Sequence, residues 1–144
     1  MTMKRIKQLL LVVVLGFTFL AGTASAETKG VFIDLSSSDI FKIHRAFAVG
    51  TMLRKMEKIP VTVFISLGVT PYAKKDYPVA KMLTLRDQSV HQHMEDFMKI
   101  GGEIMVCSMC LGGHGMTVAD LLPGMTVGMP SNLIVADDVK LLSY

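Results

Sequence analysis

The sequence predicts an α/β domain with a mostly parallel, five-stranded sheet covered by helices on both faces. Short apolar runs rich in β-branched residues alternate with longer segments whose apolar residues recur at helical spacing. The run at residues 61–67 is apolar almost throughout, which is typical of a strand buried on both faces of a parallel sheet. Such alternation requires right-handed crossovers, so the strands end at one common edge.

The first half of the domain is predicted to contain two strands joined by a long helix. Residues 30–35 form the first strand and residues 61–67 the second. Between them, residues 39–58 carry apolar side chains at helical spacing; the three serines before this segment offer N-cap oxygens, and a proline marks its exit. Residues 68–87 contain two prolines and give no clear periodicity.

The second half is predicted to contain shorter elements. A helix begins near residue 89 and ends at Gly101-Gly102, because glycine readily adopts the left-handed conformation that terminates helices. Thr117 and Asp120 have the spacing of a capping box. The remaining elements follow in the order strand 103–107, short helix from 117, strand 125–129, short helical segment from 130 and strand 139–143.

Residues 1–26 have the pattern of a secretory signal peptide. Basic residues come first, an apolar run at 9–20 follows, and the small-residue sequence Ala24-Ser25-Ala26 ends the segment. The run is shorter than the roughly 20 apolar residues that cross a bilayer, and an uncleaved membrane anchor is the alternative. We therefore expect residues 27–144 to form a single periplasmic or secreted domain, with no membrane attachment after cleavage.

The net charge of +3 comes entirely from the predicted signal peptide. Lys4, Arg5 and Lys7 are three of the 15 basic residues, so 12 remain to balance the 12 acidic residues, none of which lies in this segment. A near-neutral domain has no general basic excess of the kind that favours nucleic acid, and it permits self-association.

The two cysteines, Cys107 and Cys110, are the candidate functional residues. Cys107 ends the third predicted strand, and a glycine-rich turn that opens a helix follows. Open α/β sheets bind ligands at this edge, and a helix start supplies N–H groups that stabilise a thiolate. A disulfide across so short a loop constrains the unfolded chain little, so a purely structural role explains the pair poorly. The expected supporting residues are Met109, Leu111, Gly112 and His114.

Soft-metal binding is the main alternative. Thiolate and thioether ligands favour Cu(I), although methionine also fills cores and interfaces. The candidate ligands beside the cysteines are Met105, Met109, Met116, Met125, Met129 and His114. A third alternative is an oligomeric binding module whose cysteines are only structural.

Other polar residues have less specific interpretations. His91 and His93 point to different sides of a helix and cannot share a metal there; with His44, they are expected at the surface or an interface. Lys74 and Lys75 follow the second strand, where they either attract an anionic sulfur donor or lie in a solvated loop.

The stretch from Gly101 to Met129 resembles the DsrE/DsrF-like sulfur-relay family. The most distinctive part, residues 107–128, begins with C-S-M-C and includes T-V-A-D-L-L-P-G-M-T-V-G; the front half is similar through G-V-F-I-D-L-S and V-T-V-F-I-S-L-G-V. The resemblance implies an α/β fold of flavodoxin-like layout, assembly into homo-oligomers (trimers or hexamers), and a cysteine that carries persulfide sulfur between donor and acceptor proteins. It places that cysteine at Cys107.

Cys110 matches only the relatives that contain C-x-x-C. A persulfide on Cys107 would face Cys110, whose attack would release sulfide and leave a disulfide. The first functional hypothesis is therefore an exported sulfur-relay protein, with possible sulfurtransferase activity, in which Cys107 accepts sulfur and Cys110 resolves it. It requires no cofactor or metal.

Overall fold

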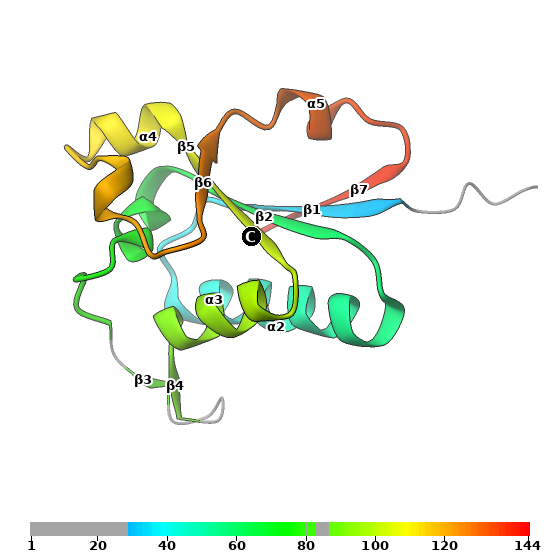
Figure 1. Ribbon diagram of the computed structural model, residues 1–144, viewed down its shortest axis with the longest axis horizontal. Helices are drawn as coiled ribbons and strands as arrows, with labels where there is room; N and C mark the ends of the chain where they lie inside the picture. The colour runs from blue at the N-terminus through cyan, green and yellow to red at the C-terminus, as the bar shows by residue number, and fades with distance from the viewer. Residues whose placement is uncertain (1–28, 80, 83–86) are drawn as a thin grey trace, which may run out of the picture.

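Five parallel strands form the central sheet of the computed structural model, which describes residues 29–79, 81–82 and 87–144. The predicted signal peptide lies outside these residues. The strands are β1 (Gly30–Leu35), β2 (Val61–Ile65), β5 (Glu103–Cys107), β6 (Thr126–Gly128) and β7 (Val139–Ser143), and their order in the sheet is β6-β5-β2-β1-β7 (Figure 1). The predicted α/β class and five parallel strands are thereby confirmed.

The strand order differs from that of flavodoxin. Numbered along the chain, the five strands lie in the order 4-3-2-1-5, whereas flavodoxin has the order 2-1-3-4-5. The order in which strands are added to the sheet reverses at β1, which pairs with β2 on one side and with β7 on the other. Between β1 and β7, the Tyr144 N–H donates to the Asp34 carbonyl oxygen at 2.9 Å. A backbone hydrogen bond thus joins β1 and β7 at the crevice where open α/β sheets usually bind ligands. Cys107 ends β5, which lies two strands away from β1.

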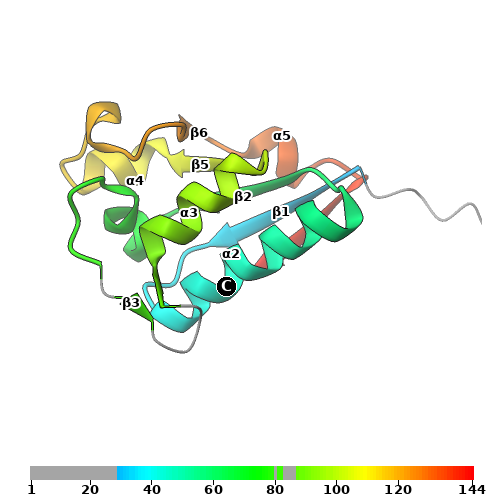
Figure 2. The same cartoon turned by 60° about the horizontal axis from the view of Figure 1, so that its bottom comes forward.

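Helices cover both faces of the sheet, but unevenly. The two long helices, α2 (Ile40–Met52) and α3 (Val90–Lys99), lie side by side on one face, and among the described residues only the short helix α5 (Ser131–Ile134) covers the other (Figures 1 and 2). Alternation along the strands divides the core accordingly. Val31, Ile33, Val63, Ile104 and Val106 pack toward the long helices, whereas Phe32, Phe64 and Cys107 form a smaller cluster that contacts Leu133 of α5.

The helix ends follow local chemistry. Asp39, rather than one of the preceding serines, caps α2 by accepting the Phe41 N–H at 2.8 Å. A single π-helical turn, Leu53–Glu57, extends α2. Ser89 caps α3 in a reciprocal capping box with Gln92. Gly101 has φ +81°, as expected for the left-handed end of this helix.

The connections bring three short segments to the carboxyl edge of the sheet. A 3₁₀ helix, η3 (Leu67–Ala73), follows β2, while α4 (Ser108–Gly113) and the 3₁₀ turn η4 (Val118–Asp120) follow β5. The predicted capping box of Thr117 and Asp120 is present, but it closes this 3₁₀ turn instead of an α-helix. The hairpin of β3 (Lys81–Met82) and β4 (Gln88–Ser89) lies apart from the main sheet. Within the described ranges, no helix is both long and apolar enough to cross a membrane.

Candidate thiol site

Cys107 lies at the carboxyl end of β5, as predicted, but its side chain is buried. Only 4% of the residue is exposed. It points to the face of the sheet opposite α2 and α3, where it packs in the cluster with Phe32 and Phe64. Its sulfur accepts the Cys110 N–H at 3.2 Å, so the expected peptide donor from the start of α4 is present. A reactive thiol at this ligand-binding edge is expected to be accessible, but the bulk of the two aromatic neighbours buries Cys107.

Cys110 lies in the first turn of α4 and forms a disulfide with Cys107. A separation of three residues across the strand-to-helix junction brings the two Cα atoms to 5.2 Å, within the range that a disulfide spans. Cys110 is partly exposed. Its sulfur accepts a second peptide hydrogen bond, from the Leu67 N–H at 3.3 Å. Each sulfur atom therefore faces one N–H group.

Leu67, the first residue of η3, connects the two loops of the site. Its φ of +51° lies in the left-handed region, which disfavours a non-glycine residue by about 1–2 kcal/mol. The neighbouring Gly68 does not adopt a positive φ. Two contacts from the α4 region hold the Leu67 peptide: its N–H donates to Cys110, and its carbonyl oxygen accepts from His114 Nε2 at 3.0 Å. Leu67 is not predicted by the sequence patterns, because it acts through backbone groups, which leave no signature in the spacing of side chains.

His114 is positioned by the way α4 ends. It is the C-cap residue, and Gly115 follows with φ +64°. The Met116 N–H donates to the Leu111 carbonyl oxygen and the Gly115 N–H to that of Gly112, both at 3.0 Å, which is the Schellman arrangement. The glycine-rich turn thus serves to aim the His114 side chain back toward the loop after β2.

The other predicted supporting residues occupy different environments. Leu111 is buried in the main core, and it helps to anchor α4 to the sheet. Met109 lies between the cysteines with 71% of its surface exposed. A Cβ atom added at Gly112 would meet nothing within 4 Å, so the surface beside Cys110 is open at that point.

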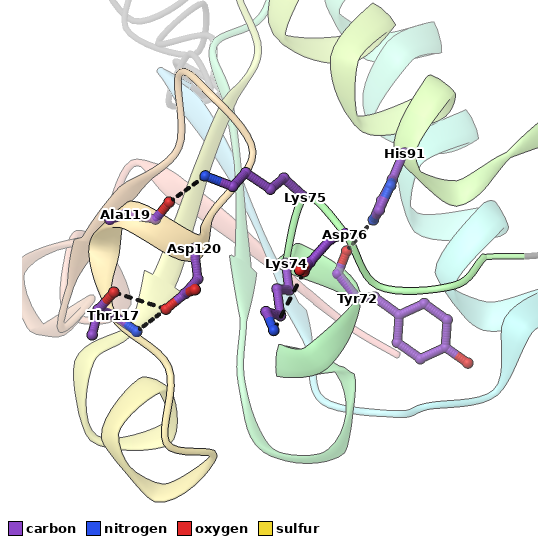
Figure 3. Close-up of polar contacts among 8 residues, drawn as sticks. All are labelled: Tyr72, Lys74, Lys75, Asp76, His91, Thr117, Ala119 and Asp120. Carbon is purple, nitrogen blue, oxygen red and sulfur yellow. Dashed lines mark hydrogen bonds and ion pairs between the residues drawn. The ribbon is translucent and has the colours of Figure 1, made fainter.

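Lys74 and Lys75 are engaged by neighbouring residues. Lys74 pairs with Asp76 at 3.3 Å, and Lys75 Nζ donates to the Ala119 carbonyl oxygen at 2.9 Å (Figure 3). Backbone bonds reinforce this connection: the Lys75 N–H reaches the Asp120 carbonyl oxygen at 2.9 Å. The two lysines therefore help to pin the carboxyl end of η3 to η4. Figure 3 also shows His91 bonded to the Tyr72 carbonyl oxygen at 3.0 Å.

Asp34 of β1 lies on the same face of the sheet as Phe32, and both line a cavity of about 390 Å³. Burial raises the pKa of this carboxyl above its usual value, while a hydrogen bond from the Ser66 hydroxyl partly opposes the shift. The rest of the lining is largely apolar and consists of Phe64, Met129, Pro130, Ser131, Ile134 and Leu141. Phe32 and Phe64 also pack in the cluster with Cys107, so the cavity and the buried sulfur share these two side chains.

His44 is predicted to lie at the surface or at an interface, and the prediction of a surface position is wrong. Its side chain is fully buried in the chain, because it lies four residues after Ile40 and three before Phe47, on the apolar face of α2. That spacing is a signal that sequence reasoning overlooked. Within the described residues, His, Cys, Asp and Glu side chains form no group of three or more that could hold a metal ion.

No protein-family model matches the sequence, and no curated protein matches it at a significant level. Solved structures do match. The YchN protein of E. coli has a TM-score of 0.65 at 15% identity, with 81% of this chain and 99% of that chain covered. Both YchN and a second match have DsrE-like folds. This chain has a DsrE-like fold.

The second match is a protein of unknown function, MTH1491 from Methanobacterium thermoautotrophicum. Its TM-score is 0.64 at 16% identity, and the similarity covers 79% of this chain and 97% of that chain. At these identities the likeness concerns the fold alone. The resemblance that the sequence suggests is thereby confirmed at the level of the DsrE-like fold, which extends over almost the whole length of both solved proteins.

Proposed function

We propose that this protein is an exported sulfur carrier in which the Cys107–Cys110 pair accepts sulfane sulfur and passes it on. One observation carries the proposal. The two sulfurs are bonded to each other at the carboxyl rim of a DsrE-like sheet, and each accepts a peptide N–H, at 3.2 Å and 3.3 Å. Peptide donors stabilise a thiolate after reduction, and the thiolate is the reactive form of cysteine.

The transfer is an exchange between thiols and sulfane sulfur. A cysteine thiolate attacks the outer sulfur of a persulfide donor, R–S–SH. A new S–S bond forms on the protein, the S–S bond of the donor breaks, and the donor leaves as the thiolate R–S⁻. An acceptor thiolate then attacks the outer sulfur, so that a persulfide forms on the acceptor and the cysteine leaves as a thiolate.

The second cysteine provides another outcome. When no acceptor is present, it attacks the inner sulfur of the persulfide, closes the Cys107–Cys110 disulfide and releases hydrosulfide. An external dithiol then reduces this disulfide and is itself oxidised to a disulfide, which returns the pair to its starting state. The disulfide in the structure corresponds to the oxidised member of this cycle.

The proposal extends to location and assembly. The predicted signal peptide favours a periplasmic or secreted protein, whose partners are a sulfur donor and an acceptor protein. Self-association as a trimer or hexamer is supported by the sparsely covered face of the sheet. There Met129, Ile134 and Leu141 are all more than half exposed around the cavity, and exposed apolar patches of this kind mark interaction surfaces.

Intact-mass measurement tests the function. The reduced domain, residues 27–144, is incubated with an alkyl persulfide, and the Cys107→Ser/Cys110→Ser double variant serves as the control. Because the second cysteine of the wild type resolves the persulfide, the adduct is measured on the single-cysteine variants Cys107→Ser and Cys110→Ser. We expect the mass of one added sulfur on at least one of them, loss of that sulfur when an acceptor thiol is added, and no adduct on the double variant; the wild type should instead close its disulfide and release hydrosulfide. Absence of the adduct, together with stoichiometric Cu(I) retention that the double variant loses, would overturn the proposal in favour of a soft-metal site.

A further inference from the structure

The two sulfurs differ sharply in their access to a donor. Cys107 is covered by Phe32 and Phe64, and 4% of it is exposed. Cys110 is partly exposed, and open space lies beyond the Gly112 and Gly113 backbone that follows it. Because thiol exchange requires direct contact between the attacking sulfur and the sulfur attacked, the more exposed cysteine is the one that a donor can reach.

The Leu67 peptide is held against the more exposed sulfur. Its N–H donates to Cys110 Sγ at 3.3 Å, and its carbonyl oxygen accepts from His114 Nε2 at 3.0 Å. Leu67 is left-handed although glycine is the residue that adopts this conformation without strain, and the neighbouring Gly68 does not adopt it. Strained non-glycine residues persist where their surroundings over-determine them, and they cluster at functional sites.

We infer that Cys110 is the sulfur that meets the donor and that the Leu67 N–H, positioned by His114, stabilises its thiolate. The inference rests on the proposed function and gives each cysteine a role in it. The family resemblance places the persulfide on Cys107, whereas the geometry makes Cys107 the resolving thiol. His114 touches neither sulfur in this structure; it acts through the Leu67 peptide and is a positioning residue.

The chemistry follows from this order. The Cys110 thiolate attacks the outer sulfur of R–S–SH, a Cys110–S–SH persulfide forms, the S–S bond of the donor breaks and the donor departs as the thiolate R–S⁻, which takes a proton from water. Cys107 then attacks Cys110 Sγ: the S–S bond of the persulfide breaks, hydrosulfide leaves, and the disulfide that the structure contains is formed. The dithiol reductant named above returns both cysteines to thiols. The Cys110 sulfur, which carries the negative charge of the thiolate before the first attack, is the sulfur that faces the Leu67 N–H.

Other hydrogen bonds hold η3 in place, so the role of His114 can be tested without disrupting the fold. The far end of η3 is pinned independently, by the Lys75 N–H to Asp120 and the Leu122 N–H to Ala73, at 2.9 Å and 3.0 Å. Loss of the His114 imidazole therefore releases only the end of η3 that carries Leu67. His91 provides a matched control, because its Nε2 makes the same kind of bond, at 3.0 Å, to the Tyr72 carbonyl oxygen of the same segment.

The first test compares single-cysteine proteins. Cys107→Ser leaves Cys110 as the only thiol, and Cys110→Ser leaves Cys107. In the folded, reduced proteins we expect iodoacetamide to modify Cys110 at least about tenfold faster than Cys107 at pH 7. The same order is expected for persulfide formation with an alkyl persulfide. Equal rates, or faster reaction of Cys107, would overturn the assignment of the receiving sulfur.

The second test measures the pH profile of Cys110 alkylation in the Cys107→Ser background, with and without His114→Ala. We expect His114→Ala to raise the midpoint and to slow the reaction at pH 7 about three- to tenfold, while the rate at the alkaline plateau is unchanged. His91→Ala should leave the profile unchanged. An unchanged midpoint in His114→Ala, or an equal shift in His91→Ala, would overturn the role of His114.

These profiles require no sulfur transfer, so they separate the inference from the function on which it rests. Failure of the protein to accept sulfane sulfur, with the predicted alkylation order intact, contradicts the proposed function only. Normal sulfur uptake with the opposite alkylation order contradicts the inference only.

Discussion

The imidazole rings of His44 and His93 meet edge to face between α2 and α3, with their centroids 4.7 Å apart. His44 is completely buried, and neither of its ring nitrogens has a hydrogen-bond partner within the described residues. Burial, reinforced by the charge of His93, lowers the pKa of His44 below its usual value of 6.5. The packing of the two long helices thus favours the neutral form of the His44 imidazole.

This pair predicts a loss of stability in mild acid. The unfolded chain binds a proton at His44 near pH 6.5 and the folded chain only at lower pH, so the free energy of unfolding falls as pH drops below 6.5. His44→Phe keeps a ring at the site and removes the titration. The free energy of unfolding in urea, measured between pH 7.5 and pH 5, should depend less steeply on pH for His44→Phe than for the wild type. Parallel slopes for wild type and His44→Phe would contradict this account.

Asp34 predicts the opposite dependence on pH. Because its pKa is raised in the folded state, its contribution to stability is complete below 3.8 and is lost as pH rises through the folded-state value. Asp34→Asn should therefore stabilise the protein at pH 7, and this gain should disappear near pH 3. The control is Asp138→Asn, which removes a carboxylate whose pKa is lowered by Lys29 and should reduce stability at pH 7. Thermal unfolding at pH 7 and near pH 3 measures whether each variant is more or less stable than the wild type.

The close contact between Gly102, just before β5, and the ring of Phe97 predicts that a larger residue does not fit at this position. A Cβ atom there would overlap the ring of Phe97, which is buried and packs edge to face against Phe47 with centroids 5.8 Å apart. We expect Gly102→Ala to destabilise the fold by about 1–3 kcal/mol. Gly113→Ala, whose Cβ meets nothing within 4 Å, should be neutral or slightly stabilising. Urea midpoints of the oxidised proteins measure both effects, and equal midpoints would contradict the packing argument.

Ser89 predicts the contribution of the α3 capping box. Its hydroxyl accepts the Gln92 N–H at 3.2 Å, while the Gln92 side chain accepts the Ser89 N–H at 2.8 Å. Ser89→Ala should cost about 1 kcal/mol of stability. Ser131→Ala is the matched control, because α5 has no side-chain cap. Comparable losses in the two variants would show that the serine side chain acts otherwise than by capping.

The sequence predicted most of the sheet because its strands are locally encoded. β1, β2 and β5 are short apolar runs bounded by strong turn and helix signals, and β5 was correct to the residue. The order of the strands is set by long-range pairing such as Ile65 with Val106, which no local pattern contains. The 3₁₀ turn at residues 118–120 is a case in which the local signal was correct but its consequence was not. Its capping box is present, but the chain does not continue as the helix that the box was expected to open.

The candidate site was predicted in position but not in detail. Strand and helix signals place Cys107 and Cys110 at the carboxyl rim, where the structure has them. The burial of Cys107 depends on Phe32 and Phe64 from two other strands, and the donor to Cys110 is the backbone of Leu67. Both features arise from tertiary contacts between residues more than 40 positions apart in the chain.

The pairing of β2 with β5 has a consequence for how folding can be followed. In the unfolded chain, Cys107 and Cys110 lie in similar surroundings and offer a reagent nearly equivalent targets. They become unequal only when Ile65 is set beside Val106, since that pairing brings the loop after β2 to the α4 junction. The ratio of labelling at the two cysteines is therefore a built-in reporter of whether the centre of the sheet has assembled.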